Sequence, residues 1–197
     1  MLYDKDIREP LFDFLEETYG KIRIIEEKQM GRSRADVVMI LPGAVCGIEI
    51  KSDADTYARL DRQVKDYNQY YDYNYVVVGT THAIHIKEHV PNWWGIITVE
   101  MEADKVDCYL WRKPEENPQV NWKKKMSLLW RPELSHIQER NQMPAYKEKS
   151  KQFVIDKILL RVEKTVLYQQ ISEELFERDY TTIEETIRKF RRRRHRS

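Results

Sequence analysis

The first part of the chain has apolar residues at a helical period and then changes to strand-like runs. Ile7, Leu11, Phe14 and Leu15 have the spacing of one helix face, which predicts a helix over residues 4–19. The run KIRIIEE at 21–27 predicts a short strand, and the polar, basic run at 28–34 predicts a loop. Residues 35–41 and 44–51 are almost continuously apolar, as in strands covered on both faces, and the Pro42-Gly43 pair predicts a tight turn between them.

After residue 54 the pattern becomes helical again. Leu60, Val64, Tyr67 and Tyr71 fall on one stripe of a helix predicted over 55–72. A strand (75–80), a short helix (82–90) and a hairpin of two strands (95–101 and 106–113) are predicted to follow. A right-handed crossover would lay the strands before and after the 55–72 helix side by side, so the order predicts an α/β core with a mixed central sheet over residues 1–112.

Two further segments are predicted beyond this core. Prolines at 114, 118, 132 and 144 punctuate residues 113–145, which predicts a linker or a segment wrapped around the core rather than strands. Residues 146–197 form a predicted C-terminal helical extension. Within it, 169–178 predicts a short helix, and Thr181 with Glu184 has the spacing of a capping box that would begin another. These two predicted helices are compatible with a DNA-binding helix-turn-helix, with a helical hairpin on the core, or with a dimerisation element.

Three charged residues interrupt the apolar strands at 35–41 and 44–51. In a hairpin with a two-residue turn at Pro42-Gly43, facing residues have numbers that add to 85, as those of Asp36 and Glu49 do. Their Cβ atoms would then lie ~5 Å apart, and the period of a strand would put Lys51 on the same side. A three-residue loop would instead send Asp36 to the opposite face.

Facing carboxylates in apolar surroundings repel, so a proton, Lys51 or a cation must offset their charge. Mg²⁺ suits two carboxylates, because it takes oxygen ligands and keeps several waters. Such a metal lowers the pKa of a bound water and stabilises charge on a phosphoryl oxygen, which is the chemistry of phosphodiester hydrolysis. A buried ion triad that only organises the core is the alternative, since the pattern is short.

Asp36, Glu49 and Lys51, in this order and strand context, resemble the signature of the PD-(D/E)xK nuclease superfamily, which has a restriction-endonuclease-like αβββαβ core. Gln63 and Tyr67 are similar to the QxxxY element of RecB-like members. The longer pattern of RAD, GIEIKSDADT, QxxxY and VPNWWG further resembles a bacterial family within that superfamily. The resemblance covers residues 1 to about 112.

This resemblance implies a fold and a set of site residues. It implies Mg²⁺ or Mn²⁺ held by Asp36, Glu49 and the carbonyl of Ile50, with Lys51 positioning the attacking water or stabilising the transition state, and with Gln63 pointing toward the site. Many relatives use one more upstream acid, for which we choose Glu27, with Glu26, Glu9 and Glu16 as alternatives. Ala35 stands where the superfamily name has proline.

The charge distribution adds candidates for nucleic-acid contact. The net charge of +1 conceals a basic end. Residues 188–197 hold seven Lys and Arg, whereas residues 1–187 hold 27 Lys and Arg and 33 Asp and Glu, which gives them a formal charge of −6. A basic run of this kind is a polyanion contact or a solvated tail. The candidate nucleic-acid-binding residues are Arg32, Arg34, Tyr67, Arg191, Arg192, Arg193 and Arg194.

Other aromatic and imidazole side chains have simpler interpretations. His82, His85 and His89 follow a helical spacing but lack a partner motif for zinc, which favours ordinary surface histidines. The pair Trp93-Trp94 could stack on bases, although packing is the more usual role of such a pair before a strand.

These observations predict a metal-dependent nuclease, with DNA favoured over RNA because the resemblance favours it. The alternatives are a catalytically silent nuclease-fold protein that binds DNA or recruits a partner, and a DNA-binding regulator acting through the C-terminal helices. No apolar run is long enough to span a membrane and the first residues do not resemble a leader, so we expect a cytoplasmic location and no membrane partner. Formation of a homodimer is left open by the sequence.

Overall fold

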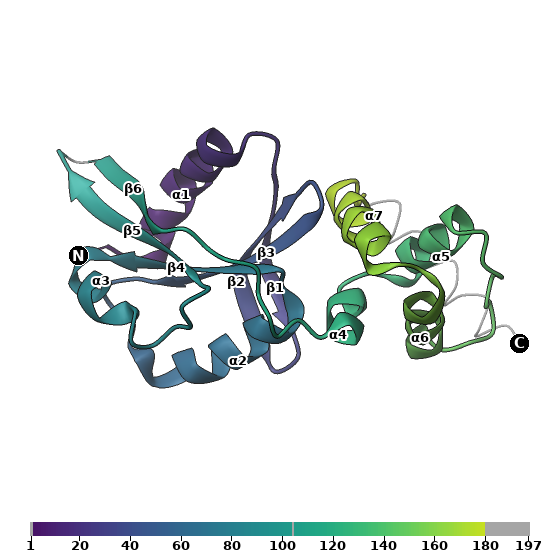
Figure 1. The fold of residues 1–197 in the computed structure, drawn as a ribbon. Helices are drawn as coiled ribbons and strands as arrows, with labels where there is room; N and C mark the ends of the chain where they lie inside the picture. The colour runs from purple at the N-terminus through teal and green to yellow at the C-terminus, as the bar shows by residue number, and fades with distance from the viewer. Residues whose placement is uncertain (1, 104, 180–197) are drawn as a thin grey trace, which may run out of the picture.

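A six-stranded mixed sheet forms the centre of the protein (Figure 1). The computed structural model describes residues 2–103 and 105–179. The strands are β1 (Arg23–Met30), β2 (Ser33–Leu41), β3 (Ala44–Lys51), β4 (Tyr73–Gly79), β5 (Gly95–Glu102) and β6 (Lys105–Arg112). They lie in the sheet in sequence order, with β4 parallel to both of its neighbours and the other pairs antiparallel. The predicted mixed sheet is therefore confirmed.

Helices cover both faces of this sheet (Figure 1). On one face, α1 (Asp4–Tyr19) packs its buried Ile7, Leu11 and Leu15 into the same apolar cluster as Ile48 and Ile50 of β3. On the other face lie the 3₁₀ turn η1 (Tyr57–Arg59) and α2 (Leu60–Tyr70), which connect β3 to β4. The short α3 (Thr80–Ile86) follows β4. Because β3 alternates its side chains between the two faces, Glu49 and Lys51 point toward α2, and Gly47 presents its backbone to the same side.

The C-terminal helices are grouped beside the sheet rather than on top of it (Figure 1). They are α4 (Trp122–Ser127), α5 (Arg131–Arg140), α6 (Lys151–Arg161) and α7 (Lys164–Phe176). The turn between β2 and β3 reaches α7, where the amide of Gly43 donates to the Ser172 hydroxyl over 2.8 Å. One apolar cluster contains both Val45 of the sheet and Ile155 and Leu167 of these helices. The extension and the α2 face of the sheet therefore share a core.

Two predicted boundaries near the hairpin strands are wrong. Most of the loop predicted at 28–34 is strand, because β1 continues to Met30 and β2 begins at Ser33, which leaves only two residues in the turn. Met30 is buried in the α2-side core and the Ser33 hydroxyl donates to the Asp66 carboxylate, so the residues on both sides of the turn have tertiary partners. The helix predicted over 55–72 is shorter, since η1 replaces its first turn and α2 ends at Tyr70.

The segment 113–145 is strand-free, as predicted, but contains α4 and α5, which its prolines concealed. Pro132 lies in the first turn of α5, where a missing N–H costs no helical hydrogen bond. The part before α4 does wrap around the core: the amide of Glu115 donates to the Trp93 carbonyl (2.9 Å) and that of Asn117 to the Asp72 carbonyl (2.8 Å).

The helix predicted at 169–178 is the second half of the longer α7. Residues 181–184, with the helix predicted to begin there, lie outside the described residues. The candidate arginines at 191–194 lie outside them as well.

Candidate active site

Asp36 and Glu49 occupy adjacent strands in the predicted register. The β2–β3 hairpin has a two-residue turn, with Leu41 paired to Ala44 and Val37 to Ile48, so the next residues along the ladder are Asp36 and Glu49. The Oδ2 atom of Asp36 accepts a hydrogen bond from the amide of Ile50 over 2.8 Å. The predicted β2–β3 register is thus confirmed as far as Val37 and Ile48, the pair adjacent to Asp36 and Glu49.

Glu49 and Lys51 form a buried ion pair beside Asp36. The side chains of Glu49 and Lys51 are 1% and 6% exposed, and Lys51 Nζ lies 2.6 Å from Glu49 Oε1. A buried carboxylate without such a partner would be strongly destabilising. The pair therefore offsets the charge of Glu49 within the protein.

Helix α2 completes the cluster with Gln63 and Tyr67. The amide nitrogen of Gln63 donates to Glu49 Oε1, and its oxygen accepts from Lys51 Nζ over 3.0 Å. The Tyr67 hydroxyl lies 2.8 Å from Glu49 Oε2 and accepts from the amide of Asp36 over 3.2 Å. Four side chains of β3 and α2 thus form a closed network, which fixes the position of Glu49 and Lys51.

A glycine lets α2 come this close to β3. A Cβ atom on Gly47 would lie 2.3 Å from a ring carbon of Tyr71 and 2.6 Å from one of Tyr67. Both tyrosine rings therefore pack directly on the backbone two residues before Glu49. Only glycine leaves this space free.

The electrostatics of the site are concentrated on Asp36. Burial, and next the neighbouring Glu49 carboxylate, raise the pKa of Asp36 from 3.8 to about 7, although the Ile50 amide and Lys51 oppose the shift. Near neutral pH this carboxyl group is therefore poised between its acid and its anion. Perturbation by both burial and a like charge is typical of functional sites.

The donor set suits a hard divalent cation. Asp36 Oδ1 has no hydrogen-bond partner among the described residues, and Glu49 Oε2 accepts one hydrogen bond, from Tyr67, so each carboxylate retains a free lone pair. With the Ile50 carbonyl, these are oxygen ligands of the kind that Mg²⁺ and Mn²⁺ prefer. No group of three or more His, Cys, Asp or Glu side chains able to hold a metal is found within 2–103 and 105–179, so any such ion would depend on the backbone and on water.

Glu27, the upstream acid chosen from sequence, lies opposite Asp36 on β1 but is held by arginines. The β1–β2 register pairs Glu26 with Val37 and Lys28 with Ala35, which leaves Glu27 and Asp36 between them. The backbone of Glu27 is left-handed, with φ of 55°, which is uncommon for a residue with a side chain. Its carboxylate pairs with Arg8 of α1 (2.8 Å) and Arg34 (2.5 Å). The role of Glu27 as a ligand stays a prediction.

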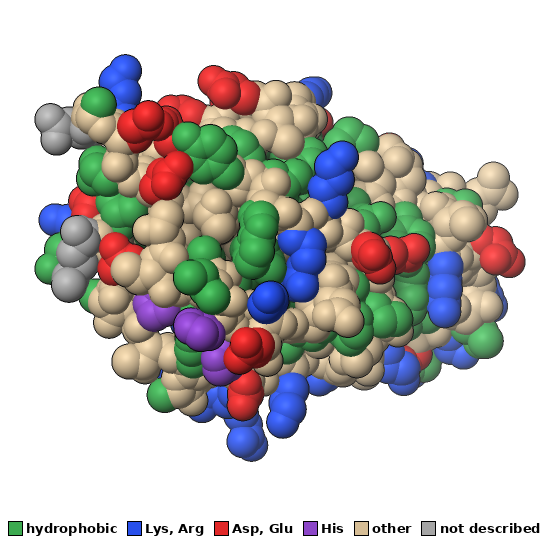
Figure 2. Space-filling view, turned by 60° about the vertical axis from the view of Figure 1, so that its left-hand side comes forward, with side chains coloured by type: hydrophobic (Ala, Val, Ile, Leu, Met, Phe, Trp, Pro, Cys, Tyr) green, Lys and Arg blue, Asp and Glu red, His purple; other side chains and the backbone are tan. Residues whose placement is uncertain are grey.

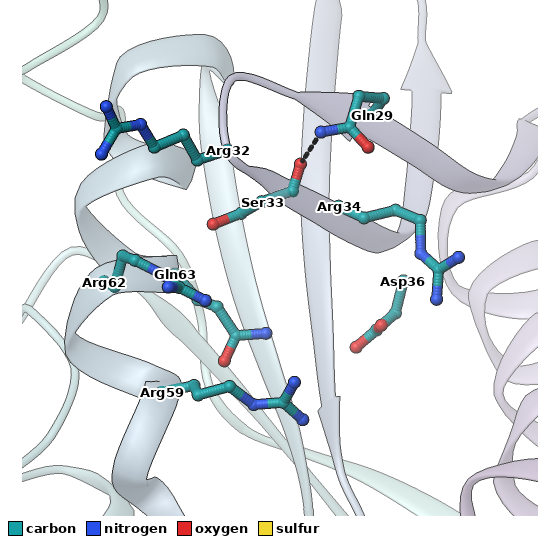
Figure 3. Close-up of a pocket in the computed structure, with 8 residues that line it drawn as sticks. All are labelled: Gln29, Arg32, Ser33, Arg34, Asp36, Arg59, Arg62 and Gln63. Carbon is teal, nitrogen blue, oxygen red and sulfur yellow. Dashed lines mark hydrogen bonds between the residues drawn. The ribbon is translucent and has the colours of Figure 1, made fainter.

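A polar pocket of about 360 Å³ opens over Asp36 and Gln63 (Figure 3). Its walls are the turn region of the β1–β2 hairpin and the start of α2. The lining residues are Gln29, Arg32, Ser33, Arg34, Asp36, Arg59, Arg62 and Gln63. Arg32 and Arg34, proposed from sequence as phosphate contacts, both line it.

Sequence reasoning missed Arg59 and Arg62, which belong to the same pocket. The signal was present, because Arg59 is four residues before Gln63 and Arg62 is adjacent to it, so all three fall on one side of a helix. The pocket therefore unites arginines from two elements that are distant in sequence.

Three of the remaining candidates take ordinary roles in packing. Trp94 is fully buried, and its indole N–H donates to Asn68 over 2.8 Å, so it has no face for a base. His82 and His89 pack their rings on Tyr57, with centroids 5.1 and 4.2 Å away. Figure 2 shows histidine side chains gathered in one surface group.

Together these features define a mixed α/β protein with a buried carboxylate–lysine cluster beneath an arginine-lined pocket. The family model described as Bacteriophage P4 protein cII matches residues 2–195. The chain therefore belongs to the bacteriophage P4 cII family.

Two other comparisons give little detail. A search of curated proteins found no match. Among solved structures, SfsA of Pyrococcus furiosus in complex with Ca²⁺ is similar with 15% sequence identity and a TM-score of 0.35. The match covers 59% of this chain and 62% of that one, so the chain spans less than two thirds of that structure.

None of the helices in the part of the chain described is long and apolar enough to cross a membrane.

Proposed function

We propose that this protein is a metal-dependent nuclease of the PD-(D/E)xK type, which hydrolyses phosphodiester bonds of nucleic acid, with DNA favoured over RNA. The observation that carries the proposal is the convergence of Asp36, Glu49 and Lys51 with Gln63 at one end of a β hairpin. The element order α1, β1, β2, β3, α2, β4 agrees with the restriction-endonuclease-like core that this class would require. We place the activity in the cytoplasm.

The side chains have distinct roles in this proposal. Asp36, Glu49 and the carbonyl of Ile50 would hold Mg²⁺ or Mn²⁺, which when bound supplies positive charge against the phosphoryl oxygens and lowers the pKa of water. Lys51, held by Glu49 and Gln63, would orient the attacking water or stabilise the developing charge. Tyr67 keeps the two strands and their carboxylates in register.

The arginines around the pocket support a polyanionic substrate. A guanidinium can form two parallel hydrogen bonds to a phosphate, which makes arginine the preferred side chain for this contact. Arg32 and Arg34 of the hairpin and Arg59 and Arg62 of the η1–α2 segment would hold a phosphate group near Asp36.

The first test is calorimetric titration of Mn²⁺ into the wild-type protein and into Asp36→Asn, because it requires no choice of substrate. We expect binding in the wild type and its loss in Asp36→Asn. Asp13→Asn is the matched control, because Asp13 is an exposed carboxylate on α1 outside the site. Cleavage of single-stranded and duplex DNA and of RNA should then be lost in Asp36→Ala and Glu49→Ala while both variants remain folded.

One observation favours a second candidate, a catalytically silent protein that binds nucleic acid. Glu49 already has Lys51, Gln63 and Tyr67 as partners, so its charge is offset without a metal. This candidate predicts no Mn²⁺ binding and no cleavage, together with binding of DNA that the Asp36→Asn variant retains. Cleavage that persists in Asp36→Ala would instead contradict the catalytic assignment.

A further inference from the structure

The pocket above Asp36 concentrates positive charge that the protein itself does not offset. Of its four arginines, Arg34 pairs with Glu27, whereas Arg32, Arg59 and Arg62 have no carboxylate partner within the described part of the chain. Arg59 and Arg62 are also three residues apart, a helical spacing at which like charges repel. All three side chains are exposed, so their charge is available to a bound anion.

The pocket is closed on the side that lies beyond Gln63 along α2, because the turn of the β1–β2 hairpin contacts α2 there. The Ser33 hydroxyl bonds to the Asp66 carboxylate. A Cβ atom on Gly31 would lie 3.3 Å from the Tyr70 hydroxyl, so the turn itself touches α2. Asp66 and Tyr70 are about one and two helical turns beyond Gln63. The two walls therefore meet on this side, whereas a groove for the middle of a strand would need two open ends.

We infer that this pocket binds the terminal phosphate monoester of a nucleic-acid strand, so that the protein recognises strand ends. The inference rests on the proposed nuclease function and specifies its substrate. A phosphodiester within a strand carries one negative charge, whereas a terminal phosphate carries up to two at neutral pH and has three free oxygens. The second fits better beside three guanidinium groups without carboxylate partners, at a pocket that is closed on one side.

The test measures binding without cleavage. In EDTA, fluorescence anisotropy compares internally labelled single-stranded oligonucleotides of one sequence that carry a 5′-phosphate, a 3′-phosphate, or hydroxyl groups at both ends. One extra charge-assisted hydrogen bond corresponds to roughly tenfold in affinity, so we expect at least about tenfold tighter binding of one phosphorylated form. Preference for either end supports the inference and gives its polarity. Equal affinity for all three forms would overturn it.

A matched pair of variants separates the pocket from general charge. Arg62→Gln should remove the preference for the phosphorylated end, whereas Lys65→Gln should retain it. Both residues are exposed on α2 and each variant loses one positive charge, but only Arg62 lines the pocket. Loss of the preference to the same extent in both variants would show a non-specific effect and contradict the inference.

A competition experiment distinguishes a strand end from a free nucleotide. Deoxynucleoside monophosphates and inorganic phosphate are titrated against the phosphorylated oligonucleotide. We expect weak competition, because the strand also contacts the surface outside the pocket. A mononucleotide that binds as tightly as the oligonucleotide would overturn recognition of strand ends.

Failure of this inference differs from failure of the proposed function. If Mn²⁺ binding and cleavage depend on Asp36 but end phosphorylation has no effect, only the inference fails. If the preference depends on Arg62 but neither Mn²⁺ binding nor cleavage occurs, the pocket assignment stands and the nuclease proposal fails.

Discussion

Asp36 shows at the scale of a single residue how a candidate site lowers stability. Its side chain lies beside the buried Glu49, and its pKa is raised to about 7 by burial and by that neighbouring charge. A folded protein that holds such a carboxyl group takes up a proton more readily than the unfolded chain does. Ionisation of Asp36 therefore favours unfolding.

We predict that Asp36→Asn stabilises the metal-free protein at pH 8. Because the pKa is 3.8 in the unfolded chain and about 7 in the folded one, stability of the wild type falls as pH rises through this interval, and the asparagine variant escapes that loss. The gain should be on the order of 2 kcal/mol above pH 7, since partial exposure screens the full shift, and should vanish near pH 4.

Urea denaturation of both proteins between pH 4 and pH 8, in EDTA, measures this gain. A difference in unfolding free energy that is constant over the range, or that favours the wild type at pH 8, would contradict the raised pKa. Asp13→Asn, on the exposed face of α1, controls for a general effect of removing a carboxylate.

At the scale of elements, the contact between β3 and α2 decides the geometry of the site. Gln63 and Tyr67 are four residues apart on α2 and both reach Glu49. They can do so only because Gly47 leaves room for the rings of Tyr67 and Tyr71. The helix therefore positions the site through a backbone contact as well as through hydrogen bonds.

We predict that Gly47→Ala destabilises the protein by about 1–3 kcal/mol, the usual range for overpacking a core. It should also weaken Mn²⁺ binding, because displaced Tyr67 no longer supports Asp36 and Glu49. Denaturation and calorimetry on the same samples measure the two effects. An Ala44→Gly variant, at the other end of β3, serves as the control for a change of strand propensity, and unchanged Mn²⁺ binding in Gly47→Ala would contradict the positioning role of α2.

The β1–β2 hairpin is irregular at the point where it borders the site. Ala35 packs in the same cluster as Val38, whereas Val37 packs on the opposite face, so the strand alternation is interrupted at Asp36. Glu27, opposite, has a left-handed backbone. Strain of this kind persists when surrounding contacts fix it, as the Arg8 and Arg34 ion pairs do here.

At the scale of the whole molecule, a buried ion pair joins the sheet to the C-terminal helices. Lys125 of α4 is fully buried and its Nζ lies 2.7 Å from Oδ1 of Asp72, which is 1% exposed. The other oxygen of Asp72 accepts from the Val45 amide over 2.9 Å. The ammonium group also lies 4.2 Å from the ring centroid of Tyr168 in α7.

We predict that Lys125→Met lowers the free energy of unfolding by about 3–5 kcal/mol, because it leaves the Asp72 charge buried without its partner. Adding Asp72→Asn should recover part of the loss. The control is Lys123→Met on the same helix, whose ion pair with Asp156 is exposed and should contribute less than about 1 kcal/mol. Urea denaturation followed by circular dichroism measures all four proteins, and equal losses in the two single variants would contradict the assigned role of the buried pair.

Local patterns in the sequence determined most of the sheet and part of the site. Apolar periodicity predicted α1 and the strands, because one face of each element must be buried. The two-residue turn at Pro42-Gly43 fixed the β2–β3 register up to Val37 and Ile48, the pair next to Asp36 and Glu49, and the strand period placed Lys51 on the same side of β3 as Glu49. These are properties of a hairpin, so no distant contact was needed to derive them.

Only the tertiary structure decided what surrounds those residues. The way α2 packs on β3 places Arg59 and Arg62 in the same pocket as Arg32 and Arg34 of the hairpin. Helix periodicity alone does not say which other element lies beside these two arginines. The left-handed backbone of Glu27 is supported by the ion pair of its carboxylate with Arg8, which belongs to a third element, α1. Similarly, local sequence pattern did not reveal α4 and α5, because their stability comes from a core shared with the sheet.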